Sequence, residues 1–341
     1  MKKAIILFNL GGPNNLDAVE PFLFNLFIDP AIISLPKILR YPLAKIISKR
    51  RAPIAKKIYS EMGGSSPILE ETQQQALAIE ESLRGEKDIY KCFISMRCWN
   101  PRAESTIEDV KNYNPDQIIL LPLYPQYSAS TSGSSIQEWI EKSKHQGLSK
   151  ETKIICCYPT ENDFILSHVN LLKNKINIKE LSNTVVIFSA HGLPENKIKK
   201  GDPYQWQVEK TVEELVKKLS IKDINFVLSY QSRVGPLKWI GPPTDETIKN
   251  YSKKSMKIIL VPVAFVSEHS ETLVELDIEY KELADKNGCI EYLRVPALGT
   301  NKDFINSLSS LVINKEENKF FEGLYPPKNQ CPNQFKKCPC L

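Results

Sequence analysis

Eight short apolar runs that alternate with helical stretches constrain the fold of this chain more than any other feature. They lie at Ala4–Leu10, Tyr90–Met96, Gln117–Leu123, Lys153–Tyr158, Thr184–Ala190, Asn225–Tyr230, Lys257–Val263 and Cys289–Val295. Between them, apolar residues recur at helical spacing in stretches such as Ser66–Leu83, Glu209–Leu219 and Glu271–Lys286. Continuous apolar strands that alternate with helices indicate parallel sheets covered on both faces. The sequence therefore predicts an α/β protein with doubly wound, Rossmann-like sheets.

The two halves of the chain also resemble each other. The segment Phe8–Pro13 resembles Ser189–Pro194, and Ile118–Pro122 resembles Ile258–Pro262. The spacing between these segments is about 40 residues longer in the first half, and the apolar region 22–53 is the natural place for the excess. We expect two similar domains at residues 1–160 and 161–300, the first with an apolar lip inserted near 22–53. Residues 301–341 are expected to form a C-terminal helix and a cysteine-containing tail.

The apolar side chains of region 22–53 permit two arrangements. They could be exposed as an apolar lip at the edge of a cleft, or they could pack on the first domain. The side chains concerned are Phe22, Leu23, Phe24, Leu26 and Phe27. A membrane span needs about 20 continuous apolar residues. None is expected here, because the stretch 22–47 is interrupted by Asp29, Pro30, Pro36, Arg40 and Pro42.

Composition and charge exclude several classes of protein. The chain is 42% hydrophobic and 25% charged, which is typical of a globular protein, and its net charge of +5 does not indicate nucleic-acid binding. A basic cluster is either a solvated helical face or a surface that attracts anionic substrate or lipid headgroups; it comprises Lys45, Lys49, Arg50, Arg51, Lys56 and Lys57. No secretory signal is visible and the eight cysteines are scattered, so we expect reduced thiols and a cytoplasmic protein, with peripheral contact to the inner membrane left open.

The site of chemistry is expected beyond the carboxyl ends of the strands, where open parallel sheets bind ligands. In this chain those ends are the Gly11 turn, the 122–135 loop, the His191 turn and the 263–270 loop. If two domains are present, the cleft where these loops face each other is the expected active site.

Two of the four histidines fall in these strand-end loops. His191 and His269 are placed to accept a proton near neutral pH or to bind a metal, although a single loop histidine is more often structural. His145 lies in a polar segment expected at the surface, and His168 lies in a predicted helix with no reactive neighbour in sequence.

A row of carboxylates follows His269. Glu271, Glu275 and Glu279 are four residues apart, so in a helix they form a ladder along one face, with Glu268 just before it. An exposed acidic helix start accounts for the first two residues but not for the continuation to Glu279. Like charges in such a ladder favour a cation among them, and imidazoles with carboxylates suit ferrous iron or similar ions.

The sequence lacks the motifs of several other metal and nucleotide sites. The sequence has no C-x-x-C pair and no H-E-x-x-H motif, which argues against structural zinc and zinc peptidases. It has neither the G-x-G-x-x-G series nor G-K-[ST], so nucleotide cofactors are not expected.

Two further segments are rich in polar or flat groups. The run Tyr124–Ser135 is dense in hydroxyls; Ser135 and Glu138 could form a capping box, and the other hydroxyls could bind an anionic ligand. The segment Gln231–Pro236 and Trp239 similarly place polar and flat aromatic groups after a predicted strand.

Taken in order, six motifs make the chain resemble the ferrochelatases, the terminal enzymes of haem synthesis. They are Asn9–Pro13, Gly63–Pro67, Leu123–Ser128, Ser189–Pro194, Tyr230–Pro236 and Val263–Asp277. The resemblance covers nearly the whole chain. It implies a chelatase-like fold of two similar domains with an active-site cleft between them, and insertion of Fe²⁺ into protoporphyrin IX.

The resemblance also implies the roles of individual residues. His191 and Glu271 would be the catalytic pair, with both also in the metal site together with His269, Glu275 and Glu279. The residues expected around the porphyrin are Leu10, Tyr127, Ser128, Ser232 and Trp239. An axial oxygen ligand is not expected at Leu10, where some relatives have tyrosine. Iron would be a substrate, and no cofactor would be required.

Some ferrochelatases bind a [2Fe-2S] cluster through C-terminal cysteines and one internal cysteine. Here Cys331, Cys338 and Cys340 could supply three thiolates, but Ala129 stands where animal relatives have the internal cysteine. A fourth ligand would have to come from another cysteine, and the tail could equally be flexible. Two alternatives to iron insertion also stay open: a sister chelatase for coproporphyrin or cobalt, and a non-catalytic tetrapyrrole or iron carrier.

Overall fold

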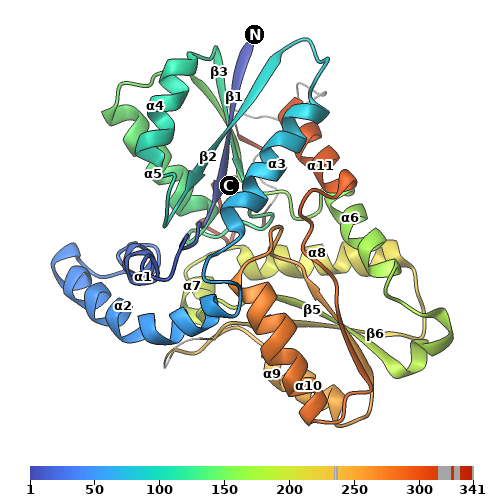
Figure 1. Cartoon of the computed structure of the whole chain (residues 1–341). Coiled ribbons are helices and arrows are strands. Elements are labelled where there is room, and N and C mark those ends of the chain that lie inside the picture. The colour runs from blue at the N-terminus through green and yellow to red at the C-terminus, as the bar shows by residue number, and fades with distance from the viewer. Residues whose placement is uncertain (234, 236, 314–323, 326–330, 340–341) are drawn as a thin grey trace. The chain divides into compact units, whose positions relative to one another are not determined.

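The computed structural model describes residues 1–233, 235, 237–313, 324–325 and 331–339 (Figure 1). The chain divides into two compact units. Of the described residues, the first comprises Met1–Cys157 with 309–313 and 324–325, and the second comprises Tyr158–Leu308 with Cys331–Pro339. Cys340, which was predicted as a possible cluster ligand, lies outside the described residues.

The first unit is built around a parallel five-stranded sheet in the order β2-β1-β3-β4-β9. Its elements are β1 (Lys2–Asn9), α1 (Val19–Phe27), α2 (Lys37–Ser60), α3 (Ile68–Ser82), β2 (Ile89–Met96), α4 (Ala103–Tyr113), β3 (Gln117–Pro122), α5 (Ser132–His145), β4 (Glu151–Ile155) and β9 (Leu324–Tyr325).

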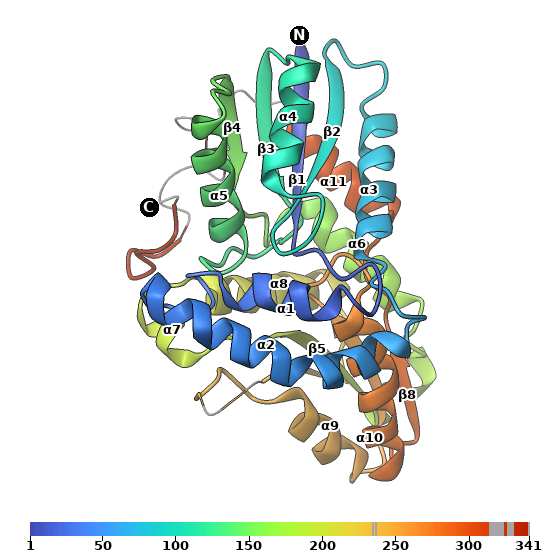
Figure 2. The same cartoon turned by 60° about the vertical axis from the view of Figure 1, so that its left-hand side comes forward.

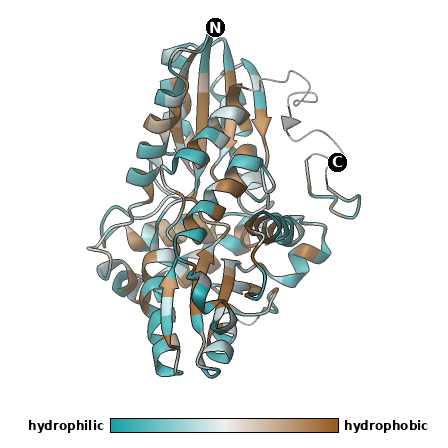
Figure 3. Cartoon of the chain, turned by 90° about the vertical axis from the view of Figure 1, so that its right-hand side faces the viewer, coloured by the Kyte–Doolittle hydropathy of each residue, from teal (hydrophilic) through white to brown (hydrophobic). Residues whose placement is uncertain are grey.

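Alternating residues of β1 explain how this sheet is covered. Ala4, Ile6 and Phe8 point to one face and pack against α4 and α5 in a common core with Ile107 and Trp139. The intervening residues of β1 are also fully buried, so both faces of the sheet are covered. Figure 3 shows the resulting pattern, with apolar colour concentrated on the strands.

Region 22–53 forms two helices that pack on each other, α1 and α2, visible in blue in Figure 2. Phe22 and Leu23 are buried in a cluster with Ala52 and Tyr59, and Leu26 and Phe27 are partly buried against it. The apolar side chains of α1 therefore pack inward for the most part. In and next to this region, the large apolar side chains that are exposed lie just before α2 or on it. They are Leu35, Ile38, Leu39, Tyr41, Ile46 and Ile54.

The prolines of this region occupy two kinds of position. Pro42 and Pro53 lie inside α2, which continues through both of them, whereas Pro30 and Pro36 fall between α1 and α2. Each internal proline removes one backbone hydrogen bond, but α2 is long enough to tolerate the loss. Among the described residues, no helix is both long enough and apolar enough to cross a membrane.

The second unit contains a parallel four-stranded sheet in the order β6-β5-β7-β8. Its elements are α6 (Asn162–Lys173), η1 (Ile178–Asn183), β5 (Thr184–His191), α7 (Glu195–Lys199), α8 (Tyr204–Leu219), β6 (Asn225–Gln231), α9 (Thr244–Ser252), β7 (Lys257–Pro262), the π-helix η2 (Glu271–Glu279), α10 (Tyr280–Lys286) and β8 (Glu291–Arg294). Helix α11 (Lys302–Ile313) contributes residues to both units.

The first four strands of each sheet follow the same order, with the second strand in sequence at one edge and the first strand next to it. The internal resemblance of the two halves therefore reflects a repeated parallel topology. The predicted α/β fold with two similar, doubly wound parallel sheets is confirmed.

The described part of the C-terminal tail, residues 331–339, packs on the second unit. The Lys337 N–H donates to the carbonyl of Gly201, and the ring of Phe335 lies 5.7 Å from that of Trp206. Gly201 has φ +90°, and a β-carbon there would lie 2.9 Å from the backbone nitrogen of Lys336. A glycine is required at this position because the tail passes directly over it.

Candidate active site

His191 stands at the carboxyl end of β5, where the alternation of the strand determines its direction. Val185 and Ile187 point to the face covered by α9, η2 and α10, and His191 has the same parity. Its side chain is 36% exposed, and its Nδ1 lies 2.6 Å from the carbonyl oxygen of Gly192. That contact fixes the ring and leaves Nε2 directed at the neighbouring helix.

The helix that His191 faces is η2, which has the wider turn of a π-helix. Glu271 begins this helix, and its Oε2 lies 3.7 Å from Nε2 of His191. The Glu271 side chain is 26% exposed, so the pair is accessible from outside the unit. An imidazole and a carboxylate at this distance can exchange a proton or share a cation.

The turn after β6 holds the carboxylates. The Ser232 hydroxyl lies 2.6 Å from Oε2 of Glu275 and 3.0 Å from Oε2 of Glu271. The Ser232 N–H donates to Oε1 of Glu275 at 3.0 Å, and Nε2 of Gln231 donates to Oε2 of the same carboxylate at 3.1 Å. Since β6 pairs with β5 so that Gln231 is opposite His191, these groups converge at one edge of the sheet.

Glu275 is the most enclosed member of the acidic ladder. Burial and the neighbouring charge of Glu271 raise its pKa, against the opposing effect of hydrogen bonds from Ser232 and Tyr280. The Tyr280 hydroxyl donates to Oε1 of Glu275 at 2.9 Å. A cation placed between the two carboxylates would relieve their repulsion.

The structure brings some predicted metal ligands together and leaves others apart. Nδ1 of His269 lies 3.1 Å from the carbonyl of Ser267, and its ring packs on Phe265 at 4.7 Å. Glu279 is exposed at the end of η2. No group of three or more His, Cys, Asp or Glu side chains among the described residues is arranged to hold a metal ion.

The loop before η2 is fixed by Arg294, a residue that the sequence did not single out. Its guanidinium donates to both oxygens of Asp277 and, at 2.7 Å, to Oε1 of Glu268. Glu268 also accepts a hydrogen bond from the Ala297 N–H. Burial raises the pKa of Glu268, but the charge and hydrogen bonds of Arg294 outweigh it and keep the pKa below its usual value. Glu268 is thus a structural anion rather than part of the ladder.

The residues predicted to surround a porphyrin are distributed over both units. Trp239 lies beside the catalytic candidate, with its ring 6.3 Å from that of His191. In the first unit, Leu10 is partly buried against the cluster of α1 and α2, while Tyr127 and Ser128 are 6% and 1% exposed. Their part in porphyrin binding stays a prediction.

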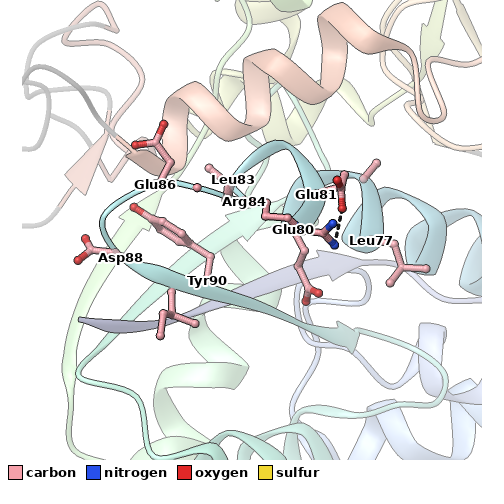
Figure 4. Close-up of a pocket in the computed structure, with 11 residues that line it drawn as sticks. Leu77, Glu80, Glu81, Leu83, Arg84, Glu86, Asp88 and Tyr90 are labelled. Atoms are coloured by element: carbon pink, nitrogen blue, oxygen red, sulfur yellow. Dashed lines mark ion pairs between the residues drawn. The ribbon is translucent and has the colours of Figure 1, made fainter.

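The second unit has a pocket of about 710 Å³ next to the ladder. Its lining includes Ser232, Trp239, Glu275 and Tyr280, so it adjoins the carboxylate pair. Another pocket, of about 670 Å³, lies in the first unit between the end of α3 and the start of β2 (Figure 4). It contains none of the candidate site residues; the Arg84–Glu81 ion pair on its rim is exposed.

Two tail cysteines lie together in the second unit. Cys331 and Cys338 are both buried, and Nε2 of Gln207 donates to the sulfur of Cys331 at 3.4 Å. The neighbouring Cys338 thiol and burial raise the pKa of Cys331 far above its usual value. Cys331 is therefore a protonated thiol unless a metal ion displaces the proton.

Comparisons with known proteins agree over almost the entire chain. The family model described as Ferrochelatase matches residues 2–316. A protein of Pelagibacter ubique named ferrochelatase is 64% identical over 343 aligned residues, which cover 100% of this chain and 99% of that protein. The ferrochelatase of Rickettsia bellii is 51% identical over 342 residues, which cover 99% of this chain and 95% of that protein.

Solved structures show the fold. SirB from Bacillus subtilis, determined with Fe³⁺, has a TM-score of 0.56 at 14% identity, covering 94% of this chain and 97% of its own. CbiX, described as the terminal enzyme for biosynthesis of siroheme in denitrifying bacteria, has a TM-score of 0.51 at 9% identity, covering 92% and 99%. Together with the match of the family model to residues 2–316, the full-length relatives show that this chain belongs to the ferrochelatase family.

Proposed function

We propose that this chain inserts Fe²⁺ into protoporphyrin IX to form protohaem, with His191 and Glu271 as the catalytic pair. The observation that carries the assignment of residues is the 3.7 Å distance between His191 Nε2 and Glu271 Oε2. A second carboxylate, Glu275, lies next to this pair, and the Ser232 hydroxyl is within hydrogen-bond distance of both carboxylates. Family membership and the names of the full-length relatives support the reaction itself.

The chemistry requires a base near the ring and a route for the metal. A free porphyrin is flat and carries two pyrrole N–H protons, which must leave as the divalent metal enters. Bending the ring exposes the nitrogen lone pairs, and binding of the rest of the macrocycle supplies the free energy for that strain. Neutral His191 is suited to take a pyrrole proton, because an imidazole is the side chain most often used as a general base.

The acidic ladder is suited to a metal that passes through. Along η2 the exposure falls from Glu279, which faces solvent, to Glu275 and Glu271 near His191. Oxygen and imidazole ligands hold ferrous iron more weakly than a cage of thiolates does. We propose that Fe²⁺ is passed from Glu275 to Glu271. His269 is proposed as a supporting ligand, although in this structure its ring contacts the Ser267 carbonyl and Phe265 instead.

The test of the catalytic pair is the variant His191→Ala. We expect it to bind protoporphyrin with unchanged affinity but to insert iron at least about 100-fold more slowly, the usual range for loss of a general base. His145→Ala removes a histidine of the first unit that has no place in the proposed site, and it serves as the matched control. Near-normal turnover by His191→Ala would reject the assignment.

The substrate range separates the alternatives. A chelatase for coproporphyrin or cobalt would prefer those partners to protoporphyrin and Fe²⁺ in parallel assays. A carrier would bind porphyrin or iron stoichiometrically and release no metallated product. A carrier also has no use for an imidazole paired with a carboxylate, which is why we favour insertion.

We further propose that α2 contacts a membrane surface. Ile38 is 85% exposed and Leu39 is 57% exposed, and α2 also carries basic residues, including Lys45 and Lys49. Apolar side chains with nearby basic groups bind anionic interfaces without spanning them. We expect Ile38→Glu/Leu39→Glu to abolish sedimentation with vesicles that contain anionic lipid, and Ile140→Glu, at an exposed position of α5, to leave it intact. Equal sedimentation of both variants would rule this surface out.

The tail cysteines carry a finer proposal, that Cys331, Cys338 and Cys340 supply three thiolates of a [2Fe-2S] cluster. The support is that Cys331 and Cys338 are buried and interact with each other, and that Nε2 of Gln207 donates to the sulfur of Cys331. Hydrogen bonds to the sulfurs are among the features that tune iron–sulfur clusters. A fourth thiolate must come from another cysteine. The cluster would supply no group to the proposed insertion step. Visible iron–sulfur absorbance in anaerobically purified protein, lost in Cys338→Ser, is the expected result; colourless wild-type protein would end the proposal.

A further inference from the structure

Ser232 has an unusual backbone conformation for a residue with a side chain. Its φ is +62°, in the left-handed region that costs free energy for residues other than glycine. Such residues persist where the surrounding structure determines them, and they concentrate at functional sites. Ser232 therefore calls for an explanation from its contacts.

Those contacts all lead to the carboxylate pair. In the left-handed conformation, both the N–H and the hydroxyl of Ser232 face η2: the N–H bonds to Glu275, and the hydroxyl lies within hydrogen-bond distance of Glu275 and Glu271. A single side chain thus touches both carboxylates at once. No other described hydrogen bond reaches the Glu271 carboxylate.

Further hydrogen bonds hold the Glu275 carboxylate in place. Gln231 donates through Nε2 to Glu275, and its Oε1 accepts a hydrogen bond from the buried Ser189 hydroxyl at 2.7 Å. The Tyr280 hydroxyl donates to Oε1 of Glu275, which also accepts from the Ser232 N–H. Glu275 is therefore fixed by three residues, whereas Glu271 depends on Ser232 for its hydrogen-bonded position.

From this geometry we propose that Ser232 is a positioning residue for metal delivery, which holds Glu271 against Glu275 and opposite His191. The inference rests on the proposed iron insertion and refines it. It also changes the role expected for Ser232, because its hydroxyl is directed to carboxylates rather than held available for a porphyrin.

The physical reason is the repulsion between the two carboxylates. Two anions in a partly buried site move apart unless donors or a cation hold them together. Ser232 supplies donors before the metal arrives, so the metal meets two oxygens already in place. Loss of a hydrogen bond to a charged group commonly costs about 10-fold to 100-fold in a binding constant.

The experiment uses two substitutions at Ser232 and the same two at a matched serine. Ser232→Ala removes the hydroxyl and keeps the strained backbone, while Ser232→Gly removes the hydroxyl and the strain together. Ser220 is an exposed serine at the end of α8 with φ +51°, and its hydroxyl contacts only the local carbonyl of Lys217. Ser220→Ala and Ser220→Gly therefore control for backbone effects.

We expect both Ser232 variants to raise the KM for Fe²⁺ about 10-fold or more, with the KM for protoporphyrin unchanged. A merely structural role would change the KM for Fe²⁺ and the KM for protoporphyrin together, or would change the melting temperature alone. If Ser232→Ala folds poorly, Ser232→Gly still decides the matter, because it relieves the backbone. An unchanged KM for Fe²⁺ in Ser232→Gly would overturn the proposal.

A second measurement separates this proposal from iron insertion itself. Co²⁺ alone is titrated into the porphyrin-free protein by calorimetry, and we expect at least about 10-fold weaker binding in both Ser232 variants and none of this loss in the Ser220 variants. If wild-type protein binds Co²⁺ in a Ser232-dependent way but makes no haem, iron insertion fails and the positioning role stands. If wild-type protein makes haem and the Ser232 variants bind Co²⁺ normally, the positioning role fails alone.

Discussion

At the scale of single residues, the neighbours of each ionisable group determine its chemistry. His191 and His168 are both imidazoles of the second unit, but His191 is 36% exposed beside a carboxylate whereas His168 is 1% exposed in an apolar core. Glu271 and Glu268 are three residues apart, yet one faces His191 and the other is neutralised by Arg294. Residue type alone did not separate these roles.

Glu271→Gln removes the charge of the catalytic carboxylate and keeps its shape. We expect kcat for iron insertion to fall about 100-fold or more, because a neutral amide can neither relay a proton nor bind Fe²⁺ well. Steady-state kinetics with protoporphyrin and Fe²⁺ check this. Glu282→Gln, in an exposed i, i+4 pair on α10, is the control and should keep the wild-type kcat.

His168 predicts an acid sensitivity of folding. Burial lowers its pKa to about 3, and neither ring nitrogen has a hydrogen-bond partner. The unfolded chain binds a proton at His168 below about pH 6.5, and the folded chain does not until about pH 3, so stability falls as the pH drops through this window. The loss amounts to about 2 kcal/mol at pH 5.

His168→Leu should remove that part of the pH dependence. Urea unfolding at pH 8 and pH 5 measures it, with His145→Leu as an exposed control that keeps the wild-type slope. An equal loss of stability at pH 5 in wild type and His168→Leu would show that another group is responsible.

At the scale of elements, the site depends on how η2 is held. Ser232 contacts the helix from the turn after β6, and Arg294 contacts it from the end of β8 through Asp277. The ladder is thus fixed from β6 and β8, the two edge strands of the same sheet.

Arg294→Met should destabilise the second unit by about 3 kcal/mol. The side chain is 11% exposed, and its loss leaves the carboxylates of Glu268 and Asp277 without their cation. Thermal or urea unfolding measures the change. Arg84→Met breaks the exposed pair with Glu81 and should cost less than about 1 kcal/mol. Similar effects of the two substitutions would contradict the account.

Gly201→Ala should release the tail at residues 331–339. The new β-carbon meets the backbone of Lys336 at 2.9 Å, and alanine is also strained at φ +90°. Hydrogen exchange of residues 331–339 should rise at least about 10-fold. Gly147→Ala has φ +70° but an open surrounding, so it reports the backbone strain without the clash, and protection of the tail should survive it.

The sequence predicted some elements better than others, for identifiable reasons. Continuous apolar runs such as Lys257–Val263 identified the buried strands, because both faces of a parallel strand are covered. Strand β9 has only two residues, too few for a pattern, and was missed. The stretch Glu271–Lys286 was expected to be helical, but its first part is a π-helix, which has no signature in apolar spacing. The contacts of Ser232 and Arg294 depend on strand register and loop geometry, which single-sequence reasoning does not give.

At the scale of the whole molecule, the chain repeats one parallel topology and uses the copies differently. In the second unit, the ends of β5 and β6 carry His191, Gln231 and Ser232. The corresponding place in the first unit follows β1 and carries Leu10, which packs against the cluster of α1 and α2. The acid–base and metal-binding groups that we assign are therefore concentrated in one copy, whereas in the other copy α1 and α2 follow the first strand.

A double-mutant cycle tests the central claim most directly. The initial rate of haem formation from protoporphyrin and Fe²⁺ is measured for wild type, His191→Ala, Glu271→Gln and the double variant. If the two side chains act as a unit, each single substitution should cost nearly as much as both together, as for other groups that act jointly. Haem formation at wild-type rates in either single variant, or losses that simply multiply in the double variant, would contradict a shared role for His191 and Glu271.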